Sequence, residues 1–81
     1  MRITVRFFAI LRDRAGLDQI ELDLNDGATA STARDEIARR FELIASMLPR
    51  VALAVNREYV KGDHTLKSGD ELALIPPVSG G

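Results

Sequence analysis

The residues best suited to chemistry in this chain are its last six, PPVSGG at positions 76–81. Glycine has no Cβ, so Gly80 and Gly81 can enter a channel too narrow for a side chain. Pro76 and Pro77 each hold φ at about −65° and favour an extended segment that projects from a domain. The pattern predicts a slender tail that threads into the active site of another protein.

Between the prolines and the glycines, Val78 offers an apolar anchor and Ser79 a hydroxyl that can set the register of the threaded tail. The reacting group would then be the α-carboxylate of Gly81. A carboxylate resists nucleophilic attack because oxide is a poor leaving group. Chemistry at Gly81 therefore requires prior activation.

Other chemistry is scarce. The chain contains no cysteine, so it has no thiol nucleophile, thiolate metal site or disulfide. Its single histidine, His64, lies among turn residues in KGDHTL, where hydrogen bonding within a loop is the simpler role. We expect no bound metal or cofactor and no catalysis by this chain alone.

Composition restricts the class of protein. The length of 81 residues suits one domain, and the hydrophobic fraction of 46% is ordinary for a soluble globular protein. A formal net charge of −1 gives no electrostatic basis for binding nucleic acid or an anionic membrane. No apolar run approaches the roughly 20 residues that span a bilayer, and no signal peptide is evident. We expect a cytoplasmic protein that binds neither nucleic acid nor a membrane.

Five stretches of the sequence that precedes the tail show strand patterns. They are MRITVRFFAI, from the first residue onward, and then QIELDL, VALAV, EYV and LALI. VALAV and EYV are predicted to form a hairpin around Asn56 and Arg57, although glycine would suit the position of Arg57 better. RDRAG predicts a short helical or irregular turn that stops at Gly16, and LIASMLPR a looser apolar segment that Pro49 ends.

One stretch has the period of a helix. In TASTARDEIARRF, apolar Ala33, Ile37 and Phe41 fall four residues apart and form one stripe. Thr29 is the expected N-cap of a helix from about residue 30 to 41.

A helix of this length cannot bury its stripe alone, so it must cover one face of a mixed sheet. We predict an α+β fold, a β-grasp or ubiquitin-like roll, with the first and last strands parallel at its centre. Residues 1–75 would form the domain and residues 76–81 a flexible tail that leaves from the middle of the sheet. The predicted core is Ile3, Val5, Phe7, Ile20, Leu22, Ile37, Phe41, Leu53, Val55, Val60, Leu66, Leu72 and Leu74.

Alternation also predicts the opposite face of the sheet. The side chains expected to point away from the helix are Arg6, Phe8, Ala52, Ala54, Tyr59, Ala73 and Ile75. We predict that Phe8, Tyr59 and Ile75 form an apolar patch beside Arg6 and that, with Ala73, this patch binds partner proteins. A local alternative is that Phe8 or Tyr59 packs against the loops around residues 11–15 or 61–65.

The segments FFAILRDRAG, AVNREYV and DHTLKSGDELALIPPVSGG resemble the MoaD/ThiS group of ubiquitin-like sulfur carriers, and within it the small subunits of molybdopterin synthase. The resemblance covers nearly the whole chain. Two terminal glycines are shared by the wider group, whereas Pro-Pro-Val-Ser points to the molybdopterin branch. The chain departs from the pattern at Ala30 and Ala33, where larger aliphatic residues are common, and at Ile75, where an aromatic is often found.

This resemblance implies a sulfur carrier of molybdenum cofactor biosynthesis. An E1-like enzyme would use ATP to adenylate Gly81, and sulfur from a persulfide donor would replace AMP to give a thiocarboxylate. With residues 76–80 threaded into the large subunit of the synthase, the thiocarboxylate would donate its sulfur to a pterin precursor and form the dithiolene.

Two alternatives to this function remain open. The chain could carry sulfur for thiamin synthesis or tRNA thiolation, or act as a ubiquitin-like modifier that joins Gly81 to a lysine. Alternatively, it could be a β-grasp interaction module that binds through its sheet and never uses its tail. The PPVS segment and the extra ELIASMLPR stretch disfavour the thiamin carrier, which is usually shorter.

Overall fold

A computed structural model describes residues 1–77 of the chain. The expectations for residues 78–81 lie outside this part. The elements follow in the order β1 (Arg2–Phe7), α1 (Ala9–Ala15), β2 (Gln19–Asp23), α2 (Ala30–Arg40), α3 (Glu42–Ala45), the 3₁₀ helix η1 (Leu48–Arg50), β3 (Ala52–Val55), β4 (Glu58–Val60) and β5 (Glu71–Ile75).

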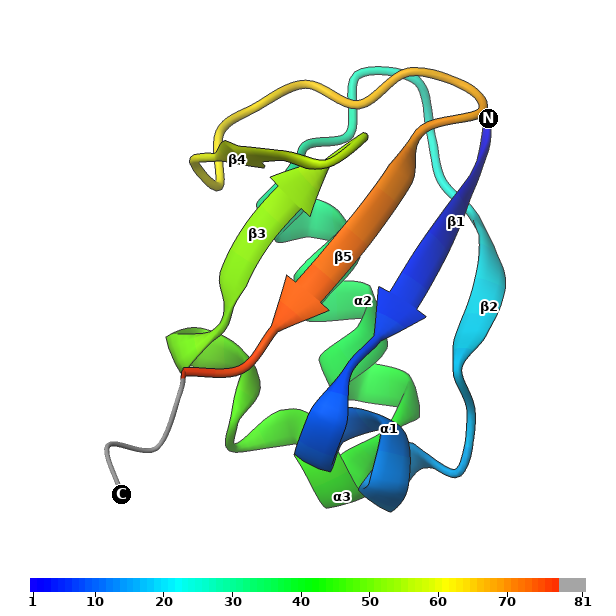
Figure 1. The fold of residues 1–81 in the computed structure, drawn as a ribbon. Coiled ribbons are helices and arrows are strands. Elements are labelled where there is room, and N and C mark those ends of the chain that lie inside the picture. The colour runs from blue at the N-terminus through cyan, green and yellow to red at the C-terminus, as the bar shows by residue number, and fades with distance from the viewer. Residues whose placement is uncertain (78–81) are drawn as a thin grey trace.

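The strands form one mixed sheet in the order β2-β1-β5-β3-β4. Figure 1 shows β1 and β5 side by side and pointing the same way, which confirms the predicted parallel pair at the centre. The other neighbours are antiparallel. Since β5 ends at Ile75, the chain leaves the sheet from its central strand pair. This is the β-grasp arrangement.

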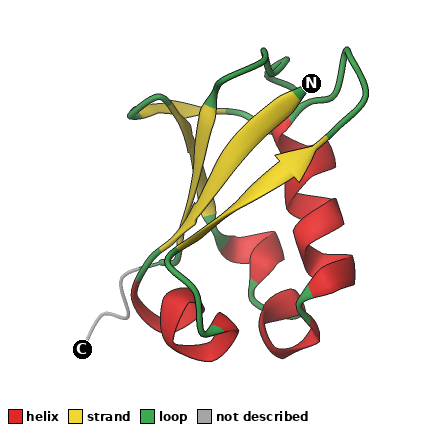
Figure 2. Ribbon diagram, turned by 90° about the vertical axis from the view of Figure 1, so that its right-hand side faces the viewer, coloured by secondary structure: helices red, strands yellow, loops and turns green. Residues whose placement is uncertain are grey.

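The helices cover one face of the sheet, and α2 runs along it (Figure 2). Thr29 is the N-cap, as predicted: its Oγ1 accepts a hydrogen bond from Thr32 N at 3.3 Å, while Thr32 Oγ1 accepts one from Thr29 N at 3.2 Å. This reciprocal capping satisfies backbone donors that would otherwise lack partners. In the last turns, hydrogen bonds from Arg39 and Arg40 hold the pKa of Glu36 below its ordinary value.

The core lies between the sheet and the helices. Its buried side chains are Ile3, Val5, Phe7, Leu11, Leu22, Ala30, Ala33, Ile37, Ile44, Leu48, Val51, Leu53, Val55, Leu66, Leu72 and Leu74. The prediction was only partly right for Ile20, Phe41 and Val60, which pack against this core but are half-buried. Ile20 and Val60 lie on the two edge strands, β2 and β4. Phe41 lies past the end of α2, and its ring packs edge-to-face against the Phe7 ring with the two ring centres 5.5 Å apart.

The boundaries differ from expectation mainly at the end of the first strand. β1 starts at Arg2 and stops at Phe7, because the chain turns at Phe8 into α1, a seven-residue helix where only a short turn was predicted. Gly16 ends α1 with a φ of 76°, so the predicted stop is confirmed. The looser apolar segment forms α3 and η1, which bury Ile44 and Leu48.

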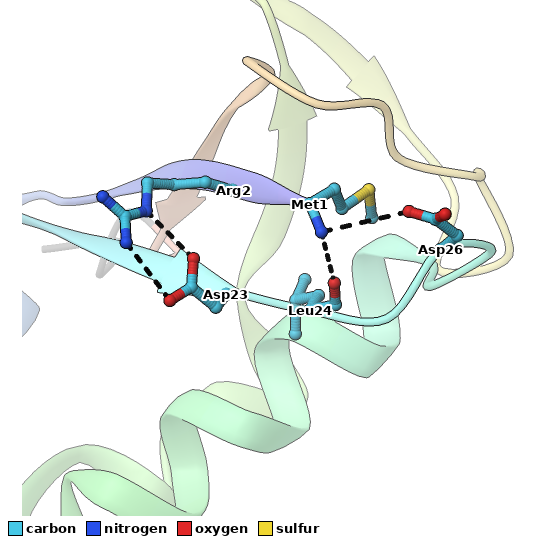
Figure 3. A network of polar contacts seen from close by, with 5 residues as sticks. All are labelled: Met1, Arg2, Asp23, Leu24 and Asp26. Carbon is cyan, nitrogen blue, oxygen red and sulfur yellow. Dashed lines mark hydrogen bonds and ion pairs between the residues drawn. The ribbon is translucent and has the colours of Figure 1, made fainter.

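The N-terminal end of β1 is tied to the segment after β2 (Figure 3). The Met1 ammonium donates a hydrogen bond to the Leu24 carbonyl at 2.8 Å and lies 3.9 Å from the Asp26 carboxylate. Next to it, Arg2 Nε lies 2.9 Å from Asp23 Oδ1, and this hydrogen bond lowers the pKa of the Asp23 carboxyl. These contacts join the start of β1 to the end of β2 and the residues that follow it. Within residues 1–77, each helix is too short or too polar to cross a lipid bilayer.

Candidate partner interface and tail root

The sheet face opposite α2 carries a shallow cavity. Its volume is about 310 Å³, and it is lined by Arg6, Phe8, Ala54, Arg57, Tyr59, Glu71, Ala73 and Ile75. All five residues predicted for the partner surface, Arg6, Phe8, Tyr59, Ala73 and Ile75, therefore lie around one hollow. We call these eight residues the docking face.

The hollow follows from the strand register. Arg6 on β1 pairs with Ala73 on β5, Ala73 with Ala54 on β3, and Ala54 with Tyr59 on β4. These four residues thus form one row across four strands, about 14 Å from end to end at the usual strand spacing. The two alanines stop at Cβ, while Arg6 and Tyr59 rise on either side. Ala54 points outward as predicted but is only 5% exposed, because larger neighbours cover it.

Phe8 and Tyr59 differ in how exposed their rings are on the docking face. Phe8 is half-buried, and the Arg6 guanidinium carbon lies 5.1 Å from the centre of its ring, within cation–π range. Tyr59 is 75% exposed. The alternative in which a loop covers Tyr59 is therefore wrong, and its ring is free to meet another surface.

The β3–β4 turn brings Arg57 to the same cavity. Asn56 and Arg57 have φ values of 50° and 72°, the left-handed conformations that a two-residue hairpin turn requires. This confirms that Arg57 occupies a position better suited to glycine, and the conformation costs roughly 1–2 kcal/mol for a residue with a Cβ.

Side-chain hydrogen bonds hold this turn. Asn56 Nδ2 donates to Asp70 Oδ1 at 2.9 Å, and Asn56 Oδ1 accepts from Glu71 N at 3.0 Å. The second oxygen of Asp70 accepts from Lys67 N at 2.8 Å. We call this network the Asn56–Asp70 clamp. It joins the hairpin turn to the start of β5 and so sets the place of Arg57 on the docking face.

The root of the tail lies against the helices at the end of the sheet. Pro76 and Pro77 line a cavity of about 150 Å³ together with Ile10, Met47 and Arg50. Pro76 is half-buried, whereas Pro77 is exposed. The chain therefore emerges at Pro77. Of the residues predicted to thread into a partner, only these two prolines are described, and Val78, Ser79, Gly80 and Gly81 lie outside.

Sequence reasoning missed Arg57 and Glu71 as parts of the docking face. Glu71 precedes Ala73 by two residues, so strand alternation alone places both on one face. Arg57 carries no comparable signal, because its approach to the cavity depends on the pairing of β3 with β4 and with β5.

Known proteins resemble this chain over its whole length. The molybdopterin synthase sulfur carrier subunits of Chlamydomonas reinhardtii and Escherichia coli are 37% and 38% identical to it. The first match covers 100% of both chains, and the second covers 98% of this chain and 99% of the relative.

Solved structures agree with the fold. The crystal structure of SAMP1 from Haloferax volcanii superposes with a TM-score of 0.91 at 28% identity, and covers 100% of both chains. The complex of subunits 1 and 2 of the molybdopterin-converting factor from Helicobacter pylori contains a chain that superposes with a TM-score of 0.72 at 29% identity, again over 100% of both chains. Residues 5–81 match the ThiS family. Sequence and fold together show that the chain belongs to the ThiS family.

Proposed function

We propose that this chain is the sulfur-carrying small subunit of a molybdopterin synthase in molybdenum cofactor biosynthesis. The observation that carries the proposal is the full-length match to proteins of that name, combined with the PPVSGG sequence that follows the central strand. The chain supplies a rigid body and a reactive terminus, and partner enzymes supply the catalytic groups.

The proposed chemistry takes place at the Gly81 carboxylate. ATP in an E1-like enzyme converts it to an acyl-adenylate, which has AMP as a good leaving group. The terminal sulfur of a donor persulfide attacks the acyl carbon and displaces AMP, and a thiol then cleaves the S–S bond to leave a thiocarboxylate. The thiocarboxylate sulfur attacks the pterin precursor in the large subunit, and hydrolysis of the acyl–sulfur link leaves sulfur on the pterin. A dithiolene needs two such cycles.

Geometry supports the same proposal. Ile75 belongs to the docking face, and the next residue, Pro76, begins the tail. A partner seated on the docking face therefore receives the tail from a set position. The five residues after Pro76 can reach at most about 17 Å when fully extended. The active site of each partner must lie within that distance of Pro76.

Recharging requires that the carrier leave one partner and bind another. A single docking face that both can recognise meets this need, with an interface small enough to permit exchange. We therefore propose that the E1-like enzyme and the large subunit both contact the docking face.

The similarity to SAMP1 supports a second candidate function, because a further crystal structure from Haloferax volcanii gives the full name as small archaeal modifier protein 1. A modifier would join the Gly81 carboxyl to a lysine of a target protein. It would need the same adenylation but no persulfide. The two functions therefore differ in what attacks the acyl-adenylate, which is a persulfide for the sulfur carrier and a lysine for the modifier.

The test is reconstitution from purified components. The chain, its E1-like enzyme, ATP and a sulfur donor are incubated, and intact mass is measured for the gain expected when sulfur replaces oxygen. The charged chain is then mixed with the large subunit and the pterin precursor, and the dithiolene product is measured. A charged chain that transfers no sulfur to the precursor would refute the proposed function.

Two variants make this test specific. Deletion of Gly81 should abolish sulfur transfer, with no change in melting temperature because the buried core lies within residues 3–74. A chain extended by one glycine keeps the same terminal chemistry but displaces it by about 3.5 Å, and it should also transfer poorly. Lysine adducts of target proteins in place of sulfur transfer would favour the modifier.

A further inference from the structure

The docking face has an uneven distribution of charge. Arg6 and Arg57 line its cavity together with a single acidic side chain, Glu71. Ala54 and Ala73, whose side chains stop at Cβ, line the same cavity as the two arginines. The cavity therefore has one more positive than negative charge, although the chain as a whole has a net charge of −1.

Arg6 has an N–H donor without an acceptor in the described part of the chain. Its Nη1 lies 3.8 Å from Glu71 Oε1, beyond hydrogen-bond distance. Its Nε is buried and has no hydrogen-bond partner within residues 1–77. A buried N–H without an acceptor is costly, and guanidinium groups form their strongest hydrogen bonds in bidentate pairs with carboxylates. Arg6 is thus held by the Phe8 ring and by a loose ion pair, with donors left for an outside acceptor.

The second arginine of the cavity, Arg57, also favours a carboxylate as the group that binds there. It keeps a left-handed backbone that glycine would adopt at lower cost, and the Asn56–Asp70 clamp holds that turn in place. Within the described part of the chain, Arg57 makes no ion pair. The turn therefore brings to the cavity a second cation that has no ion-pair partner within residues 1–77.

We propose that the large subunit inserts a carboxylate side chain into this cavity, above Ala54 and Ala73 and between Arg6 and Arg57. On binding, Arg6 exchanges its loose contact with Glu71 for hydrogen bonds to that carboxylate. This inference rests on the proposed function, because it names the chemistry of the partner at the docking face.

Other occupants fit the cavity less well. An inserted lysine would meet two cations and one anion at close range, which is unfavourable in a partly desolvated site. An inserted apolar side chain would take water from both guanidinium groups without offering them an acceptor. An anion both accepts hydrogen bonds from the arginines and neutralises their charge.

The test compares the affinity of the large subunit for charge-neutralised variants by isothermal titration calorimetry. Arg6→Gln and Arg57→Gln should each weaken binding about tenfold or more, as expected when one partner of a desolvated charge pair is removed. Arg39→Gln is the matched control, since Arg39 lies on α2 behind the sheet and is 75% exposed. It should bind like the wild type.

Glu71→Gln decides the sign of the partner's charge. It leaves both arginines in place and removes the internal competitor for Arg6, so it should tighten binding if the inserted group is a carboxylate. Weaker binding by Glu71→Gln would show that the partner presents a cation and would overturn the inference. Melting curves of all four variants verify that each is folded.

Salt gives an independent readout. Wild-type affinity should fall as ionic strength rises, and Arg6→Gln should show a smaller fall. If Arg6→Gln and Arg57→Gln bind the large subunit and transfer sulfur as well as the Arg39→Gln control does, this inference is refuted but the proposed function is not. Failure of the wild type to bind the large subunit would refute the proposed function, and the inference with it.

Discussion

Replacement of Asp70 by alanine tests the Asn56–Asp70 clamp. Asp70 is a carboxylate with only 9% of its surface exposed, and it is the one charged side chain among the buried residues of the described part of the chain. It accepts hydrogen bonds from the Asn56 side chain and from Lys67 N, and so joins the hairpin turn to the loop before β5. The variant leaves both donors without their acceptor.

The magnitude follows from these two bonds. A hydrogen bond to a charged group contributes about 1.5–3 kcal/mol net. Asn56 and Lys67 are themselves exposed, so water can replace part of each bond, and the low end of the range applies. We expect a loss of roughly 2–3 kcal/mol in the free energy of unfolding. The whole domain has about 4–12 kcal/mol at the usual stability per residue, so the loss is substantial.

The assay is urea and thermal denaturation followed by far-ultraviolet circular dichroism. For a domain of this size, the expected loss corresponds to a fall in melting temperature of roughly 10–20 °C. Asp63→Ala, an exposed carboxylate on the same loop, is the control and should change stability by less than about 0.5 kcal/mol. Equal stabilities of the two variants would refute the assigned role of the clamp.

Three further changes test other parts of the structure. Hydrogen bonds from Arg39 and Arg40 lower the pKa of Glu36 below its ordinary 4.5. The stability that they add is thus present above pH 4.5 and is lost as the pH falls through the lower pKa of the folded state. The difference in unfolding free energy between wild type and Glu36→Gln should close on acidification, and a difference independent of pH would contradict this reasoning. Arg57→Gly removes the Cβ that disfavours a φ of 72° and should raise stability by roughly 0.5–1 kcal/mol in urea melts; a decrease would show that the arginine side chain stabilises the free chain. Ile75→Glu should weaken binding to both the large subunit and the E1-like enzyme in calorimetry with little change in melting temperature, and unaltered affinity for both would remove Ile75 from the interface.

Much of the fold could be predicted because its signals are local. Alternation of apolar and polar residues identified β1 and β2, and short strand-like stretches between turn residues identified β3, β4 and β5. The spacing of Ala33 and Ile37 identified α2. Thr29 indicated where that helix starts, because threonine is a favoured N-cap residue. Once a single helix must cover a mixed sheet, few topologies remain, and the β-grasp arrangement is one of them.

The short helices were harder to predict for a physical reason. Each of α1, α3 and η1 is too short to show a full helical period, so its burial depends on contacts from elsewhere in the chain. Leu11, Ile44 and Leu48 are buried only because these segments meet at one end of the sheet. The error at Ile20 and Val60 has the opposite cause, since an edge strand looks like a central strand in sequence but is covered less completely.

The amino-acid sequence by itself determined the chemical nature of the C-terminal residues and which strand residues face away from the helix, since both depend only on residue type and on the two-residue period of a strand. Tertiary structure alone decided that Arg6, Ala73, Ala54 and Tyr59 form one row and that Arg57 lines the same cavity. Register between strands far apart in the chain is set by the packing of the whole core against the sheet. The cavity and its two arginines therefore arise only in the folded protein.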